Sequence, residues 1–349
     1  MNETTLKGID IKAVSYWLTH NIAGAKPPFD FSLIAAGGSN LTFRVTDDAG
    51  HTWALRRPPV TARIATAHDM AREWNIMSAL DHHSDVPVPK MLGYCDDLKV
   101  NQAPFYVMSF VEGLILRDQA STKNLTVTQC LTATHSLIDT QIAFHSVDID
   151  AVGLGTLAKT RENYVERQLN RWRKQIHAAK IRELPVLDAL HLRLLKNIPP
   201  EQTRPGLAHG DYRFDNTVLS DDYRIAAVLD WELCTVGDPI ADFVWSLLYW
   251  ADPTDSVTWL LDPPTLNPHF IQRDTVVELY AQRSGLDLSQ LDYYMAFSWW
   301  KQACIVEGVY ARLKKGASGG MKVDSIDAIA DRVDTYLDIA TQLTDQAGC

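Results

Sequence analysis

The sequence predicts an α+β fold in which a small antiparallel β lobe precedes a larger, mainly helical lobe. Short apolar or alternating runs, separated by turns that contain glycine or proline, fill residues 28–110 and are typical of strands. Beyond Gly113 the apolar residues recur at helical spacing instead. The chain has 349 residues, of which 46% are hydrophobic, so it can bury a core in each of two lobes. We expect the β lobe to occupy residues 1–110 and the helical lobe residues 111–349.

The charge balance and the cysteines limit the partners and the compartment. With 33 basic and 43 acidic residues the net charge is −10, which disfavours nucleic acid or an anionic membrane as the main partner. The 5 cysteines are dispersed and form no C-x-x-C pair, a pattern typical of reduced thiols in a cytoplasm. The N-terminus lacks the basic-then-apolar order of a signal peptide, and the most apolar stretch is too short to span a bilayer. We therefore expect a soluble, cytoplasmic protein.

The β lobe begins after a short amphipathic helix, which the pattern predicts over residues 9–23. The run F-S-L-I-A-A-G-G-S-N-L-T-F-R-V then predicts two strands joined by a turn. Glycines in such a turn let backbone N–H groups approach a phosphate, and the polar residues can add donors. An ordinary hairpin turn explains the same residues equally well. The turn consists of Gly37, Gly38, Ser39 and Asn40.

The next strand, T-W-A-L-R-R-P-P at residues 52–59, ends in a pair of arginines. The helical pattern that follows, Ala67 to Leu80, carries Glu73. The spacing from Arg56 to Glu73 leaves room for a turn and two helical turns, so Glu73 can pair with Arg56. Two solvent-exposed arginines and a solvated glutamate are the alternative interpretation.

The remaining strands and helices follow from the same patterns. Residues 86–94 are a proline-marked entry to another strand, and the strand F-Y-V-M-S-F-V-E-G at residues 105–113 completes the lobe. Long amphipathic helices are predicted over residues 126–145 and 161–180, and further helices after Pro239 and Ile271. Asp238, directly before Pro239, is predicted to cap a helix.

The stretch from Leu207 to Glu232, L-A-H-G-D-Y-R-F-D-N-T-V-L-S-D-D-Y-R-I-A-A-V-L-D-W-E, carries the chemistry. It predicts a loop, a strand, a turn and a second strand that ends in an acid. The fold-back can bring Asp211, Asn216 and Asp230 together. Two carboxylates and an amide oxygen are hard ligands of the kind that hold Mg²⁺ beside phosphates. A hairpin with acidic turn residues is the structural alternative.

The motif H-G-D-x-x-x-x-N, followed by an apolar strand and D-W-E, resembles the aminoglycoside phosphotransferase/choline kinase-like family. The run R-R-P-P resembles the acyl-CoA dehydrogenase-associated branch of that family. The resemblance implies a protein-kinase-like fold, with a β N-lobe and a helical C-lobe, and the use of ATP and Mg²⁺. It implies that Asp211 orients the acceptor hydroxyl and takes its proton, while Asn216 and Asp230 hold Mg²⁺.

The resemblance extends to the nucleotide site. The family has a similar loop of glycine followed by Ser-Asn-x-Thr-aromatic, which Gly37 to Phe43 matches. In the kinase plan a Lys on the third strand binds the phosphates and pairs with a helix Glu; here Arg56 stands at that position, and Glu73 would be its partner. A hinge strand would bind adenine through the backbone of Ser109 and Val111, with Met108 lining the pocket.

The function implied is ATP- and Mg²⁺-dependent phosphoryl transfer to a hydroxyl group of a small molecule, such as a hydroxyacyl-CoA-type metabolite. An aminoglycoside kinase is one alternative, because a polycationic substrate would suit the negative net charge. A nucleotide-binding pseudokinase is another, because Arg replaces the usual Lys. The G-x-S-x-G string of serine hydrolases also occurs, at residues 316–320, but a predicted helix precedes it where that motif needs a strand. Gly316 is therefore predicted to end that helix.

Overall fold

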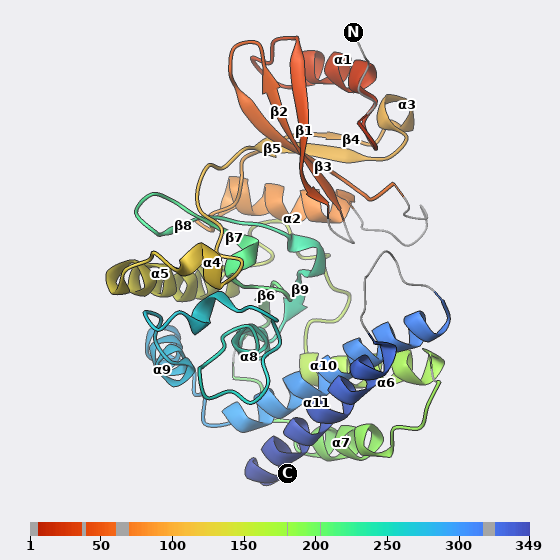
Figure 1. Ribbon diagram of the computed structural model, residues 1–349, viewed down its shortest axis with the longest axis vertical. Helices are drawn as coiled ribbons and strands as arrows, with labels where there is room; N and C mark the ends of the chain where they lie inside the picture. The colour runs from red at the N-terminus through yellow and green to blue at the C-terminus, as the bar shows by residue number, and fades with distance from the viewer. Residues whose placement is uncertain (1–5, 37–39, 61–69, 180, 203, 317–324) are drawn as a thin grey trace. The chain divides into compact units, whose positions relative to one another are not determined.

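A five-stranded antiparallel sheet with the order β1-β2-β3-β5-β4 dominates the N-terminal part of the computed structural model (Figure 1). Helix α1 precedes the sheet, α2 connects β3 to β4, and a short helix, α3, connects β4 to β5. Residues 6–36, 40–60, 70–179, 181–202, 204–316 and 325–349 are described. The elements are α1 (Ile11–Asn21), β1 (Phe29–Ala36), β2 (Leu41–Asp47), β3 (Thr52–Arg57), α2 (Met70–His83), β4 (Met91–Cys95), α3 (Leu98–Asn101) and β5 (Phe105–Ser109).

The alternation of side chains along β3 gives its two faces different neighbours. Successive side chains of a strand point to opposite faces. Leu55 faces α1 and belongs to the hydrophobic core that Val14 and Leu18 of α1 complete. Arg56 lies on the other face, where it meets Glu73 of α2. Arg57 returns to the α1 face, so the two adjacent arginines serve different parts of the structure.

The chain divides into two compact units, each built from several segments. Unit 1 comprises Met1–Leu116, Asp148–Gly155 and Phe214–Leu233, and unit 2 comprises Arg117–Val147, Thr156–Arg213 and Cys234–Cys349. The predicted lobe boundary after residue 110 stays a prediction, since these units group residues by contact rather than by order along the chain. The boundary at Arg213 and Phe214 falls inside the H-G-D-x-x-x-x-N motif.

A two-stranded hairpin completes unit 1 and contains the predicted strand–turn–strand of the motif. The strand β7 (Thr217–Leu219) pairs antiparallel with β8 (Ile225–Val228). Leu114, just after β5, bonds to Leu219 in both directions, with N–O distances of 2.8 Å. A side chain at Gly113 would not fit there, because a Cβ would lie 2.2 Å from the carbonyl oxygen of Leu219. The sheet and the hairpin are thus joined within one unit.

Unit 2 is mainly helical, as the sequence predicts. The helix α10 packs extensively on α11 and also contacts α6, α7 and α8. None of the helices in the described part of the chain combines the length and the apolar character needed to cross a membrane. The elements are α4 (Gln119–Thr122), α5 (Val127–His145), α6 (Tyr164–Ala179), α7 (Pro185–Lys196), β6 (Gly206–Ala208), β9 (Thr235–Gly237), α8 (Pro239–Leu247), α9 (Arg273–Ser284), α10 (Leu291–Lys314) and α11 (Ile326–Gln346).

The predicted helix ends agree with the structure where local chemistry sets them. Thr126 caps α5 and Gln129 bonds back to it, which forms a capping box. The Asp238 carboxylate accepts the N–H groups of Ile240 and Ala241 at the start of α8, as predicted. Gly316, with φ +77°, follows the end of α10, so a helix rather than a strand precedes the G-x-S-x-G string; residues 317–320 lie outside the described part.

One predicted strand is too long. The pattern extends it to residue 113, whereas β5 ends at Ser109. Pairing explains the difference, because Ser109 is the last residue of β5 that faces a partner on β3. The segment that follows runs on to Leu114 and its bonds with the hairpin.

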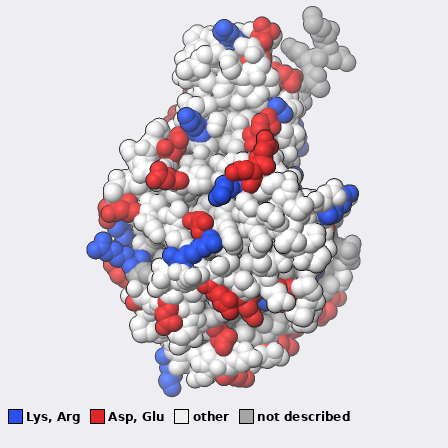
Figure 2. Space-filling model, turned by 90° about the vertical axis from the view of Figure 1, so that its left-hand side faces the viewer, with Lys and Arg blue, Asp and Glu red and all other residues white. Residues whose placement is uncertain are grey.

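Acidic and basic side chains are mixed on the molecular surface shown in Figure 2. On this face the blue Lys and Arg side chains lie among red Asp and Glu side chains, rather than in one extended basic area. A nucleic-acid interface concentrates positive charge. The distribution on this face is therefore in line with the prediction from net charge, which stays a prediction for the whole surface.

Candidate active site

The loop that carries Asp211 begins at a short strand pair in unit 2. The strand β6 pairs antiparallel with β9, with Leu207 opposite Val236. Gly206 opens the pair where no side chain would fit, since a Cβ would lie 2.4 Å from the carbonyl oxygen of His145. Gly210 has φ +83°, a conformation that favours glycine. The backbone path of the loop thus favours glycine at both of these positions before Asp211.

A buried carboxylate, that of Asp242 on α8, holds this loop through hydrogen bonds to its backbone. Its oxygens accept the backbone N–H of His209 at 3.1 Å and that of Gly210 at 2.8 Å. The Nε2 atom of His145, on α5, lies 3.0 Å from the same carboxylate, and the Tyr280 hydroxyl lies 2.8 Å from the His145 Nδ1 atom. Burial alone would raise the pKa of Asp242, but the bonds from His145 and the Gly210 backbone hold it below its usual range. The carboxylate is therefore ionised and acts as a fixed acceptor.

The Asp211 carboxylate is positioned and partly open to solvent. The Tyr249 hydroxyl donates to its Oδ1 atom at 2.5 Å, and the Arg213 Nε atom lies 3.6 Å from the same oxygen. The Arg213 guanidinium in turn lies 5.1 Å from the centre of the Tyr249 ring. Burial and the nearby charge of Asp211 raise the pKa of Tyr249 well above its usual value, so Tyr249 stays a donor. The side chain of Asp211 keeps 23% exposure, enough to meet a substrate.

A buried lysine lies in the same unit. Lys301, on α10, is 9% exposed, and its Nζ atom lies 3.8 Å from the centre of the Trp245 ring. Among the described residues no ion pair or hydrogen bond joins its ammonium group. Burial lowers the pKa of Lys301 to about 8, against the raising effect of Asp242 and Asp211. Trp245 lies one helical turn before Tyr249, so this cation is close to the group that holds Asp211.

Replacement of Asp242 by alanine is expected to lower the free energy of unfolding of the protein strongly. The change leaves two buried backbone N–H groups and His145 without their acceptor, which should cost about 3–5 kcal/mol of unfolding free energy. Because the folded pKa of Asp242 is lowered, its contribution is present at neutral pH and is lost as the pH falls through that pKa. Urea unfolding of the wild type and of Asp242→Ala at neutral and acidic pH measures both effects.

The exposed Asp338 on α11 provides the control. Asp338→Ala removes the same group without a buried partner, so we expect a change within about 0.5 kcal/mol. Equal losses in the two variants would show that Asp242 does not hold the loop.

Unit 1 contains a buried ionic triad around Arg56. Its Nε atom lies 3.3 Å from the Glu73 carboxylate, and an Nη2 atom donates to Asp230 Oδ1. Burial raises the pKa of Glu73 to about 7, although the Arg56 charge opposes this. Burial alone would lower the pKa of Arg56, but Tyr106, Glu73 and Asp230 raise it, so Arg56 stays charged. The predicted Arg56–Glu73 pair is present, and Asp230 joins it.

The residues predicted to hold a metal, Asn216 and Asp230, flank the β7–β8 hairpin, one directly before β7 and the other shortly after β8. The carbonyl oxygen of Asn216 accepts the N–H of Leu229 at 2.8 Å. The hairpin therefore brings the backbone of Asn216 next to the residue that precedes Asp230. Asp230 has φ +65°, a conformation rare outside glycine and common at functional sites. A carboxylate and an amide oxygen suit Mg²⁺, and a cation there would share Asp230 with Arg56.

The phosphate loop and the hinge are covered only in part by the described residues. Gly37, Gly38 and Ser39 lie outside them. Asn40 is described: its Nδ2 atom donates to Glu232 Oε2 at 3.0 Å, so it would have to leave that bond to reach a phosphate. The Ser109 N–H donates to the Lys90 carbonyl at 2.8 Å, so this N–H would have to leave that bond to reach a nucleotide.

The predicted hinge side chain at Met108 is buried next to that backbone. It is 6% exposed and pairs with Ala54 of β3. Val111 follows the end of β5. The roles assigned to these three hinge residues stay predictions.

A model of the phosphotransferase enzyme family matches residues 30–286. The chain belongs to this family. The match spans the sheet, the triad and the Asp211 loop, and it confirms the predicted enzyme class. Acyl-CoA dehydrogenase family member 11 of Gallus gallus is 32% identical over 287 residues, which cover 80% of this chain and 36% of the relative. The chain spans about two fifths or less of the length of such curated relatives.

Solved structures of phosphotransferases confirm the kinase-like fold. A Ralstonia eutropha protein described as a "putative aminoglycoside phosphotransferase" has a TM-score of 0.80 and 28% identity, with 97% of this chain and 98% of that chain covered. The aminoglycoside phosphotransferase APH(4)-Ia, solved with ADP and hygromycin B, has a TM-score of 0.60 and 15% identity, with coverage of 97% and 99%.

The sequence interpretation missed the groups that support Asp211 in this phosphotransferase. Asp242 lies in an apolar helix and His145 at the end of an amphipathic one, and neither pattern by itself predicts a role in the site. A usable signal was present, because a carboxylate inside a buried apolar helix must find donors. Tyr249 gave no such signal, since its hydroxyl meets Asp211 across 38 residues of sequence.

Proposed function

We propose that the chain transfers the γ-phosphoryl group of ATP to a hydroxyl group of a small molecule. The observation that carries this proposal is the Asp211 carboxylate, held on one side by Tyr249 and on a loop that Asp242 fixes. Such a carboxylate can orient an acceptor hydroxyl and take its proton. Phosphoryl transfer asks little covalent chemistry of a protein, so positioning and charge neutralisation carry catalysis.

The residues of unit 1 fit the nucleotide and its metal. Arg56 has more N–H donors than the Glu73 and Asp230 contacts use, which leaves donors for phosphate oxygens. Asp230 and Asn216 would hold Mg²⁺, which when bound neutralises the charge of the phosphates. The structure solved with ADP and hygromycin B supports nucleotide use, since that protein shares the fold.

The acceptor is proposed to carry a negative charge. A buried ammonium at Lys301, with no carboxylate partner among the described residues, favours an anionic group near Asp211. The polycationic aminoglycosides would be repelled by Lys301 and by Arg213. A hydroxyacyl-CoA-type metabolite combines a hydroxyl group with negative charges, and the name of the acyl-CoA dehydrogenase relatives supports it. We therefore rank this acceptor class above the aminoglycosides.

The pseudokinase alternative rests on Arg56. An arginine at this position is planar and multidentate where lysine is a point charge, so its contacts with phosphates differ in geometry. In the structure Arg56 already neutralises Asp230, so a metal–nucleotide complex would have to share this carboxylate with Arg56 or take its place. An enzyme that binds nucleotide and cannot make this exchange would not transfer phosphate.

One experiment separates these functions. The protein is incubated with Mg-ATP and with three acceptor groups, namely hydroxyacyl-CoA esters and hydroxycarboxylates, aminoglycosides, and neutral alcohols, and products are identified by phosphate-31 NMR. We expect a phosphate ester from the anionic group. Calorimetric titration with Mg-ATP is the companion measurement. Binding without any product favours the pseudokinase, and absence of Mg-ATP binding contradicts the kinase proposal.

A further inference from the structure

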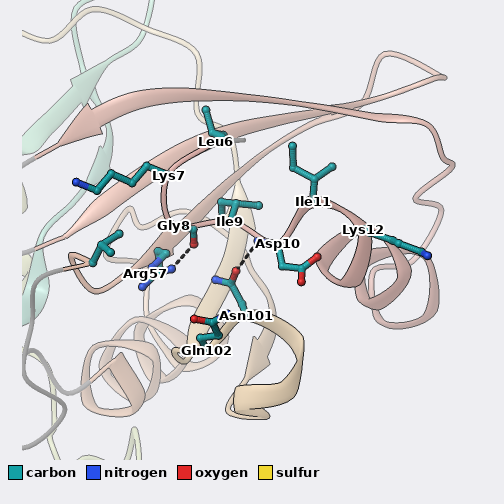
Figure 3. Close-up of a pocket in the computed structure, with 11 residues that line it drawn as sticks. Leu6, Lys7, Gly8, Ile9, Asp10, Ile11, Lys12, Arg57, Asn101 and Gln102 are labelled. Carbon is teal, nitrogen blue, oxygen red and sulfur yellow. Dashed lines mark hydrogen bonds between the residues drawn. The ribbon is translucent and has the colours of Figure 1, made fainter. Parts of the chain in front are cut away.

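A pocket lies entirely within unit 1, beside the segment that leads into α1 (Figure 3). It has a volume of about 760 Å³ and is lined by residues 6–12, Arg57, Val60, Asn101 and Gln102. None of these residues belongs to the set proposed for phosphoryl transfer. Most of the lining comes from the segment that leads into α1 and from the end of α3, and Arg57 is the lining residue that β3 contributes.

Arg57 is a buried cation at this pocket, and no carboxylate of the described residues pairs with it. It is 6% exposed. Its Nε atom donates to the Pro58 carbonyl at 2.9 Å, and an Nη1 atom donates to the Gly8 carbonyl. Among the described residues no carboxylate pairs with it, and burial lowers its pKa. A buried guanidinium bonded to carbonyl groups alone retains its full positive charge for a ligand.

The close approach of the N-terminal segment to Arg57 depends on Gly8. This residue has φ +100°, and a Cβ there would lie 3.3 Å from Arg57 Nη1 and 3.1 Å from Val60 Cγ2. The missing side chain leaves room for the guanidinium to reach the Gly8 carbonyl. The pocket wall is therefore built around this arginine.

Asn101 supplies a second donor without an acceptor. It is 3% exposed, and its Oδ1 atom accepts the backbone N–H of Asp10 at 3.0 Å. This bond fixes the amide orientation, and the buried Nδ2 atom has no hydrogen-bond partner among the residues that the structure describes. In Figure 3 the amide nitrogen lies on the side of Asn101 that faces Arg57. Two buried groups that can only donate thus line one pocket.

We propose that this pocket binds a small organic anion. Its carboxylate or phosphate group accepts hydrogen bonds from Arg57 and Asn101, because such bonds neutralise the Arg57 charge and give the Asn101 amide nitrogen an acceptor. Its apolar part lies against Leu6, Ile9 and Val60, which line the same pocket. The proposal concerns a ligand site separate from phosphoryl transfer and does not depend on the proposed function.

The other charges around the pocket favour an anion. Lys7 and Lys12 also line it, and Figure 3 shows both side chains extending away from Arg57, so they contribute at longer range. Asp10 is the one carboxylate in the lining. Its Oδ1 atom accepts the Ala13 N–H at 3.0 Å and caps α1. This bond, together with the start of the helix, offsets part of its negative charge.

Calorimetric titration of the full chain with hexanoate, hexyl phosphate and 1-hexanol tests the site. The key variant is Asn101→Asp, which keeps an oxygen for the Asp10 N–H and replaces the donor by an acceptor with negative charge. We expect the wild type to bind at least one of the two anions, and the variant to bind it about tenfold more weakly or worse. The carboxylate and the phosphate probe show which anion is preferred, and 1-hexanol should not bind.

The matched control is Asn197→Asp, the same change at an exposed residue of unit 2, which should leave the affinity unchanged. Arg57→Lys is the second variant: it retains the charge without the planar fork, and it should also weaken binding. Circular dichroism verifies that the variants are folded. If Asn101→Asp does not fold, the result with Arg57→Lys decides whether the proposal holds. Failure of the wild type to bind either anion, or equal binding in the wild type and the deciding variant, overturns the proposal.

Discussion

Replacing Asp211 with asparagine is expected to abolish phosphoryl transfer while leaving the binding of Mg-ATP largely intact. Asparagine has nearly the same shape, and its amide oxygen can still accept the Tyr249 hydroxyl. It cannot take a proton from the acceptor. Loss of a positioned general base should lower the turnover number by about 10²–10⁴-fold. Steady-state kinetics with an accepted hydroxylated substrate measures the loss, and calorimetric titration with Mg-ATP measures nucleotide affinity.

The control for this change is Asp221→Asn. Asp221 is exposed in the turn between β7 and β8, so the same substitution there should leave both turnover and affinity close to wild type. If Asp211→Asn retained near-normal turnover, Asp211 would not be the base. A loss of nucleotide binding in step with activity would instead show that the substitution disturbs the loop.

The motif could be predicted because its information is local. Asp211, Asn216 and Asp230 lie within 20 positions of one another, and turn residues and a short apolar run separate them. Those patterns predict a hairpin, and the structure has β7 and β8 there. The residue types and their spacing are therefore sufficient to predict the two strands of this segment and the turn between them.

The support of the loop could not be predicted in the same way, because it is assembled from distant parts of the chain. His145 and Asp242 are 97 positions apart, and their bond depends on the end of α5 coming close to the start of α8. Periodicity predicts each helix and which of its faces is buried. It does not say which buried polar residue on one helix meets which residue on another. Only the tertiary structure shows that Asp242 accepts from the His209 and Gly210 backbone.

The two arginines of β3 differ in how much of their surroundings could be predicted from the sequence. Strand alternation alone requires that Arg56 and Arg57 point to opposite faces. The ion pair of Arg56 with Glu73, which the family resemblance implies and the spacing allows, is present in the structure. The surroundings of Arg57 depend on a backbone carbonyl, that of Gly8, and on Asn101 of α3. Neither has a sequence pattern that points to an arginine.

Replacing Lys301 with methionine is expected to stabilise the protein. At neutral pH the buried ammonium lowers stability, since burial shifts the folded pKa to about 8. This shift corresponds to roughly 3 kcal/mol, from which the lost contact with the Trp245 ring must be subtracted, so a net gain of about 1–3 kcal/mol is expected. Between the folded and unfolded pKa values the unfolded chain binds the extra proton, so wild-type stability rises with pH. The advantage of the variant should therefore shrink in alkaline urea titrations.

The same variant should lose its preference for anionic acceptors. If the Lys301 ammonium binds a negative group of the acceptor, Lys301→Met raises the KM for that acceptor about tenfold or more, and leaves the KM for a neutral acceptor unchanged. Lys315→Met, at an exposed position after α10, is the control and should change neither stability nor KM. A variant that gains stability and keeps its KM would show that Lys301 does not contact the acceptor. A variant that loses stability would show that the ammonium has a favourable partner in the folded protein. The combination of higher stability with weaker anion binding is what distinguishes a functional buried charge from a structural one.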